Sequence, residues 1–290
     1  MSSPPSHYGP STQLIFDWDD TICPSSFIEA SSLTNITETT LETQRLFARI
    51  AGESEKLLTA AAKYGPVLLI TNSDAGWVHY SCEKYLPTLL PFLNTSQVSI
   101  ISARTAYEAQ YPNQPLCWKA AAFAHEVNER WTEVRESEDG DCDYCEEDVA
   151  CESPIKVAPT IAPTESTAAT TVTPSGATAP SCPPRQILSI GDSLSERTAV
   201  KIVASQLSAL SKSVQFLHAP APLLILGQVV LLQRYLPSIV STAQTLDLEI
   251  TQEQALRSAE SLMQVSKAVT NVKSGPGSEV KGQEGIAAVN

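Results

Sequence analysis

The chain has 290 residues and a formal net charge of −13 at pH 7. A chain of this length can bury a substantial core in one large domain or two small ones. Its negative charge would repel a phosphate backbone, so we expect no nucleic-acid partner.

The N-terminus and the cysteines predict an intracellular, cytoplasmic protein. Residues 1–12 have neither the basic nor the apolar region of a signal peptide, and we expect them to be disordered. An odd number of cysteines, seven, then suggests reduced thiols. Gln228 interrupts the most apolar stretch, residues 223–232, so we expect no run that spans a bilayer and no membrane partner.

Short apolar runs alternate with helical patterns between residues 13 and 240. Nearly continuous hydrophobicity is typical of parallel strands that are covered on both faces. Together with the intervening helices, it predicts an α/β fold with a doubly wound, Rossmann-like parallel sheet of about five strands. The predicted strands are residues 13–16, 67–70, 98–102, 187–190 and 214–218.

One long segment interrupts this alternation. Residues 136–184 are first dense in Asp and Glu and then rich in Pro, Thr and Ala. Such a composition cannot bury enough apolar area to offset its ordering entropy, so we expect a disordered insertion between two parts of the core, 13–135 and 185–240. The insertion joins a helix to the next strand, which predicts that it leaves the sheet at the edge opposite the active site.

The insertion has two further interpretations. Its four cysteines could bind zinc, although their spacing differs from familiar zinc knuckles and acidic residues crowd them, so a solvated acidic loop is favoured. Its acidic run could also recruit a basic protein partner, against which a solvated linker is again favoured. The four cysteines are Cys142, Cys145, Cys151 and Cys182.

The C-terminal region predicts one helix and a tail. Thr251 and Gln254 have the spacing of a capping box, which indicates a helix within residues 241–270. Residues 271–290 read as a disordered tail. The expected apolar face of the helix consists of Leu256, Ala259, Met263 and Ser266.

Acidic motifs follow the first and the fourth predicted strand directly. The first strand leads into Asp17-Trp18-Asp19-Asp20-Thr21, and the fourth leads into Gly191-Asp192-Ser193-Leu194-Ser195-Glu196. In sequence and order, these segments resemble the first and fourth motifs, D-x-D-x-T and G-D-S-x-x-[DE], of the haloacid dehalogenase superfamily of aspartate-nucleophile phosphotransferases.

The resemblance implies a role for each carboxylate. Asp17 would be the nucleophile that forms an aspartyl-phosphate, and Asp19 would protonate the leaving oxygen and later deprotonate water. Mg²⁺ would be bound by the carboxylates of Asp17 and Asp192 and by the backbone carbonyl of Asp19, with Glu196 acting through bound water.

The remaining two motifs are shorter. The resemblance places Thr71 and the neighbouring Asn72 at the substrate phosphate, with Ser73 as a weaker alternative to Thr71. Lys119 would pair with the nucleophile and stabilise charge on the transferring phosphoryl group. Arg104 is the second candidate for that cation because it follows the third strand closely.

The chain lacks room for the cap domain that many superfamily members carry. The segments after the first motif and after the third strand, residues 22–66 and 103–116, are both short. We therefore expect an open, capless site, which suits a macromolecular substrate that covers the site itself.

These expectations combine into a Mg²⁺-dependent phosphate-monoester hydrolase, a phosphatase, acting on a phosphorylated protein or small molecule. The alternative is a non-catalytic regulatory or binding protein that keeps the fold and uses its acidic insertion. A receiver domain is disfavoured, because its phosphorylated aspartate would lie between the acidic pair and Thr71, and Asp192 follows Lys119 instead.

Overall fold

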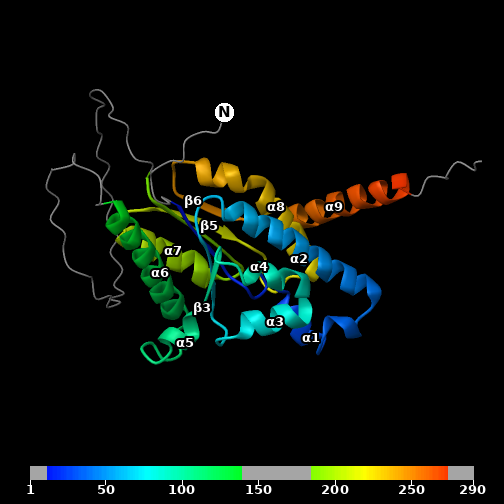
Figure 1. Cartoon of the computed structure of the whole chain (residues 1–290), viewed down its shortest axis with the longest axis horizontal. Coiled ribbons are helices and arrows are strands. Elements are labelled where there is room, and N and C mark those ends of the chain that lie inside the picture. The colour runs from blue at the N-terminus through cyan, green and yellow to red at the C-terminus, as the bar shows by residue number, and fades with distance from the viewer. Residues whose placement is uncertain (1–11, 139–183, 274–290) are drawn as a thin grey trace, which may run out of the picture.

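A six-stranded parallel sheet forms the centre of the molecule (Figure 1). The computed structural model describes residues 12–138 and 184–273. Most of each segment expected to be disordered, and the four cysteines of the insertion, lie outside the described residues. The expected bounds are wrong at their ends, because β1 begins at residue 12, α6 continues to residue 138 and α9 continues to residue 273. The strand order is β3-β2-β1-β4-β5-β6, which confirms the predicted α/β, doubly wound class. The strands are β1 Thr12–Phe16, β2 Val67–Thr71, β3 Val98–Ser102, β4 Gln186–Gly191, β5 Leu210–Gln215 and β6 Leu246–Glu249.

Two strands differ from the sequence-based prediction. The fifth strand was expected at residues 214–218, but β5 begins at Leu210, and β6 was not expected at all. Both contain charged residues, which interrupt the continuous apolar pattern that identified the other strands. Lys212 is fully buried and donates through Nζ to the carbonyl oxygens of Ile239 at 2.6 Å and Thr242 at 2.6 Å, so it satisfies the C-terminus of the following helix.

Helices cover the sheet on both faces. One layer contains α2, α8 and α9, with α3 and α4 near one end, and the other contains α5, α6 and α7 (Figure 1). The α-helices are α1 Ser25–Ala30, α2 Leu41–Ala61, α3 Trp77–Tyr85, α4 Leu90–Leu93, α5 Ala103–Tyr107, α6 Pro115–Glu138, α7 Leu194–Gln206, α8 Pro222–Ser241 and α9 Gln252–Lys273. Two 3-10 helices, η1 Ile36–Glu38 and η2 Pro87–Leu89, complete the described elements.

No cap domain is present in the described part of the chain. Only α1 and η1 lie between β1 and α2, and only α5 lies between β3 and α6. The carboxyl ends of the central strands are therefore covered by short elements alone, as the sequence predicted.

Helix α8 corrects one expectation about membranes. By length and composition it could cross a bilayer, because the helix continues beyond the apolar stretch to Ser241. Here it is a core helix, with Ile225, Val229 and Leu236 buried in the same hydrophobic cluster as α2 and the sheet.

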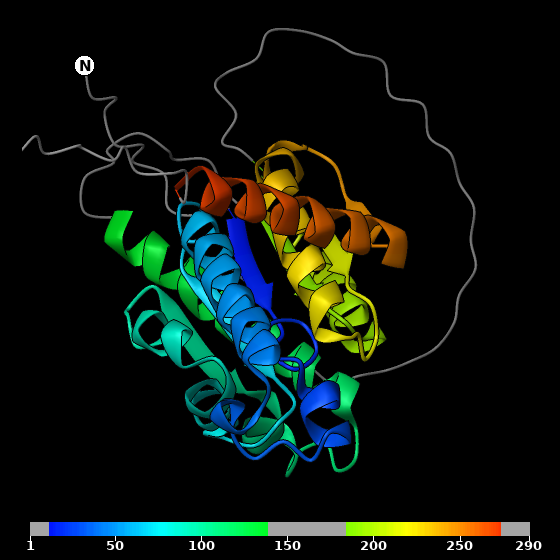
Figure 2. The ribbon, with the colours of Figure 1, turned by 90° about the vertical axis from the view of Figure 1, so that its right-hand side faces the viewer.

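Helix α9 begins at the predicted capping box. The Thr251 N–H donates to Gln254 Oε1 at 2.9 Å, and the Gln254 N–H donates to Thr251 Oγ1 at 3.3 Å. The helix lies across α8 and α2 (Figure 2). A Cβ on Gly227 of α8 would stand 1.9 Å from the Ala255 carbonyl oxygen, so only glycine permits this approach. Ala255 and Ala259 are consequently buried, whereas the expected contact Leu256 is exposed.

Candidate active site

The functional candidates lie at the carboxyl ends of β1, β2 and β4. Phe16 of β1 pairs with Leu69 of β2 and Ile190 of β4, so the residues after these strands meet at one edge of the sheet. Asp17 is fixed there because its N–H donates to the Ile190 carbonyl oxygen at 2.8 Å. Asp17, Thr71 and Asp192 thus lie at the carboxyl ends of three neighbouring strands, as expected.

A buried lysine connects the first and fourth motifs. Lys119, in the second turn of α6, places Nζ 2.7 Å from Asp17 Oδ1 and 2.8 Å from Glu196 Oε1. Its third hydrogen bond goes to the Ile70 carbonyl oxygen at 2.6 Å. Burial opposes its charge, yet Asp17 and Glu196 together raise the pKa of Lys119 above its ordinary value. Arg104, the second candidate, instead pairs with Asp74 and Glu108 at the surface.

Glu196 serves the fold and the site together. Its Oε1 accepts from Lys119, while Oε2 accepts from the backbone N–H and the hydroxyl of Ser193 in a capping box that begins α7. Gly191 makes room for this side chain, since a Cβ there would meet Glu196 Cγ at 2.6 Å. Burial disfavours the carboxylate, but the contacts with Lys119 and Ser193 lower the pKa of Glu196 overall.

Three buried carboxylates could hold a metal ion. Asp17, Asp192 and Glu196 each offer an oxygen, and these oxygens lie within 4.8 Å of one another. Burial raises the pKa of Asp17 although Lys119 opposes the rise, and burial and the charge of Glu196 raise the pKa of Asp192 to about 6. A divalent cation with hard oxygen ligands would relieve this repulsion, so the donor set fits Mg²⁺.

The Asp19 side chain is surrounded by hydrogen-bond donors. Oδ1 accepts from Ser25 Oγ at 2.5 Å and from the Trp77 indole at 2.7 Å. Oδ2 accepts from Thr71 Oγ1 at 3.0 Å and from Ser73 Oγ at 2.7 Å. These four hydrogen bonds fix the position of the Asp19 side chain.

The two candidate phosphate ligands after β2 have different surroundings. Thr71 is buried and uses its hydroxyl as a donor to Asp19 and an acceptor from the Ser73 N–H. The Asn72 amide nitrogen lies 3.4 Å from the Pro115 carbonyl oxygen, and its buried Oδ1 has no hydrogen-bond partner among the described residues. The structure therefore brings Thr71 into the Asp19 cluster and leaves Asn72 oriented toward the start of α6.

Two contacts of the site come from residues that the sequence motifs do not include. Trp77 donates to Asp19 and lines a cavity of about 410 Å³ with Ser25, Glu29 and Tyr85. His218 places Nδ1 3.2 Å from Asp192 Oδ2. Neither residue has a motif spacing that signals its place, because both reach the site from other elements.

Comparisons with protein-family models, with curated proteins and with solved structures find no match.

Proposed function

We propose that this chain is a Mg²⁺-dependent phosphate-monoester hydrolase that acts through an aspartyl-phosphate on Asp17. The observation that supports this most directly is the Asp17 carboxylate, buried at a sheet edge, paired with Lys119 and close to two further carboxylates. A carboxylate in such a setting can act as a covalent nucleophile toward phosphorus. The resemblance to haloacid dehalogenase motifs gives the same assignment.

The first chemical step would form a bond between Asp17 and phosphorus. Oδ1 of Asp17 accepts from Lys119, so Oδ2 is the oxygen available for attack. As the phosphorus–leaving-oxygen bond breaks, protonated Asp19 would give its proton to the leaving oxygen. Lys119 would balance negative charge on the phosphoryl oxygens.

The second step would release phosphate. Asp19, now a carboxylate, would take a proton from water as the water oxygen attacks phosphorus and the Asp17–phosphorus bond breaks. Asp17 and Asp192, with the Asp19 backbone carbonyl, would hold Mg²⁺, which supplies charge neutralisation at the phosphate. Glu196, which pairs with Lys119, would contact the metal through bound water.

No cap domain covers the carboxyl edge within residues 12–138 and 184–273, which bears on the substrate class. Without a cap, a macromolecular phosphate ester could reach Asp17 directly and exclude water by its own surface. We therefore extend the proposal to phosphoproteins as a substrate class, alongside small esters.

The test is hydrolysis of p-nitrophenyl phosphate with and without Mg²⁺ by wild type, Asp17→Asn and Asp74→Asn. Asp74 is an exposed acid after β2 and serves as the matched control. We expect metal-dependent turnover that falls at least ~10³-fold in Asp17→Asn, because the nucleophile is removed. Asp74→Asn should stay near wild type.

A second measurement is needed in case the enzyme does not hydrolyse p-nitrophenyl phosphate. Beryllofluoride with Mg²⁺ mimics an aspartyl-phosphate and should raise the Tm of wild type but not of Asp17→Asn. Turnover that persists in Asp17→Asn contradicts the proposal. Absence of both turnover and a Tm shift favours the non-catalytic binding protein.

A further inference from the structure

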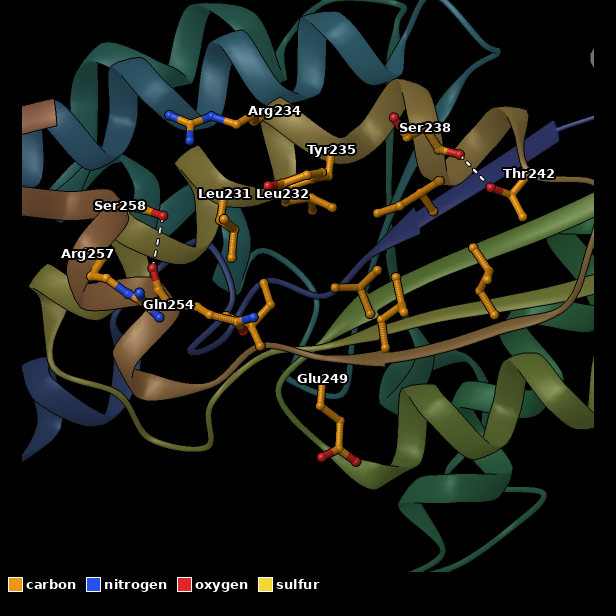
Figure 3. A pocket seen from close by; sticks show the side chains of 15 residues that line it. Leu231, Leu232, Arg234, Tyr235, Ser238, Thr242, Glu249, Gln254, Arg257 and Ser258 are labelled. Carbon is orange, nitrogen blue, oxygen red and sulfur yellow. Dashed lines mark hydrogen bonds between the residues drawn. The ribbon is translucent and has the colours of Figure 1, made fainter. Parts of the chain in front are cut away.

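A groove separate from the candidate active site lies between α8, β6 and α9 (Figure 3). Its volume is about 630 Å³, within the range of small-molecule sites. None of its lining residues belongs to the carboxylate and lysine cluster described above. We call it the β6 groove. Its lining residues include Val214, Leu231, Leu232, Ile239, Leu246, Leu248 and Ile250, all aliphatic.

The alternation of β6 explains why this groove is apolar. Asp247 and Glu249 turn toward Arg197 of α7 on one face of the sheet. Leu246 and Leu248 consequently face the other side, under α8 and α9. Helix α9 contacts α8 through Ala255, against Gly227, and does not fill the space over the edge strand. Leu248 remains 37% exposed, which leaves apolar surface on the groove floor.

Positive charge predominates at the groove, although the whole protein has a net negative charge. Three charged residues line it. The side chain of Glu249 points away from the groove (Figure 3), and its carboxylate forms an ion pair with Arg197. Arg234 and Arg257 remain; Arg257 points toward Gln254 at the groove, whereas Arg234 extends away from the aliphatic lining, with Ser258 between them (Figure 3). Arg234 has no ion-pair partner among the described residues, and Arg257 has only an exposed contact of 3.3 Å with Glu253.

We propose that the β6 groove binds an aliphatic carboxylate free in solution, with its chain along the leucines and its head group at Arg257, where Arg234 adds a second positive charge to the rim. Guanidinium groups suit carboxylates because they can donate two parallel hydrogen bonds. The aliphatic lining has no aromatic ring other than Tyr235, which favours a flexible alkyl chain over a flat ring system. The charge complementarity at one end distinguishes this ligand from a neutral lipid or an apolar peptide.

The test is calorimetric titration of the full-length protein with dodecanoate and with dodecyltrimethylammonium, both kept monomeric. The two probes share a chain and differ in head-group charge. A net charge of −13 would favour the cation, whereas the groove favours the anion, so the order of affinities is diagnostic. We expect one dodecanoate per chain with a Kd on the order of 100 μM, and weaker binding of the cation.

Two double variants with the same loss of charge locate the head group. Arg234→Gln with Arg257→Gln should weaken dodecanoate at least ~10-fold, as expected for a lost charge-assisted contact. Lys63→Gln with Lys84→Gln, remote from the groove, should change the Kd less than about twofold. Leu248→Glu, at an already exposed floor position, should abolish saturable binding while circular dichroism stays unchanged.

Several outcomes would overturn the assignment. Tighter binding of the cation, equal effects of the two double variants, or no saturable heat with dodecanoate each contradict it. Binding to anionic vesicles without binding of monomeric dodecanoate would assign the groove to a membrane surface instead. A dimer in sedimentation that Leu248→Glu dissociates would assign it to a second copy of the chain.

Discussion

Two clusters of charged residues lie on this sheet, one at the carboxyl edge and one beside β6. They differ in how deeply their side chains are buried. Lys119 with Asp17 and Glu196 is almost fully excluded from water. Arg197 with Asp247 and Glu249 contains as many charges, but Glu249 is 61% exposed. A buried charge that loses its partner is costly, whereas water replaces the partner of an exposed charge. Similar ion pairs should therefore respond very differently to the same kind of substitution.

The largest effect should come from Lys119→Met. The substitution leaves Asp17 and Glu196 buried together without their cation, and we expect a loss of roughly 3–5 kcal/mol in the free energy of unfolding at pH 7. Urea denaturation in EDTA measures it. Lys201→Met, which removes an exposed lysine from Asp247, is the matched control and should cost less than ~1 kcal/mol. Equal losses in the two variants would show that the Lys119 cluster is solvated.

A gain of stability is expected from Asp192→Asn in metal-free protein. Burial raises the folded-state pKa of Asp192 to about 6, so its ionisation destabilises the fold increasingly as pH rises from about 4 to 6 and fully above that. The variant should be more stable than wild type at pH 8, by on the order of 2 kcal/mol, and nearly equal at pH 4. Melting curves at both pH values test this. Mg²⁺ should remove the difference by stabilising wild type, and a gain that is the same at both pH values contradicts the explanation.

Trp77→Phe should have a smaller effect, confined to catalysis. It removes the donor to Asp19 Oδ1 and keeps an aromatic ring beside the cavity. Loss of one hydrogen bond to a charged group suggests a fall in kcat of about tenfold with little change in KM. Steady-state kinetics would check this beside Tyr80→Phe, a neighbouring exposed aromatic residue. A change in KM alone would indicate a substrate contact instead of a positioning role.

A small effect should come from Arg197→Met at the exposed cluster. The guanidinium contacts Asp247 at 2.6 Å and 2.9 Å, and also Gln215, and because these contacts face water we expect a loss of stability well below that of Lys119→Met. The loss should shrink in 1 M NaCl, where screening already weakens the exposed pairs. A loss as large as that of Lys119→Met would remove the distinction between the two clusters.

The same contrast explains what could be predicted from sequence. Apolar runs marked β1 to β4, and the acids directly after β1 and β4 marked the edge where Asp17 and Asp192 lie. By contrast, β6 is only four residues long and half acidic, and Lys212 interrupts β5, so hydrophobic patterning could not identify either strand reliably. The positions of these charged residues are explained only by their contacts with α7 and with the C-terminal end of α8.

The site shows the same limit. Lys119 and Thr71 could be selected because they occupy motif positions in the right order. Trp77 and His218 could not, because their contacts with Asp19 and Asp192 depend on how α3 and the loop after β5 pack. The two contacts of Glu196, one in the capping box of α7 and one with Lys119, likewise could not be predicted together from the sequence.

The sheet order has a consequence for the chain as the ribosome makes it. Strand β1 precedes the other described strands in the chain but lies between β2 and β4, and β4 begins only at Gln186. Until that residue emerges, β1 presents one unpaired edge, and Asp17 and Lys119 lack Glu196. Residues up to Glu196 must therefore be translated before Asp17 is enclosed, and the nascent chain depends on a much later segment to protect β1.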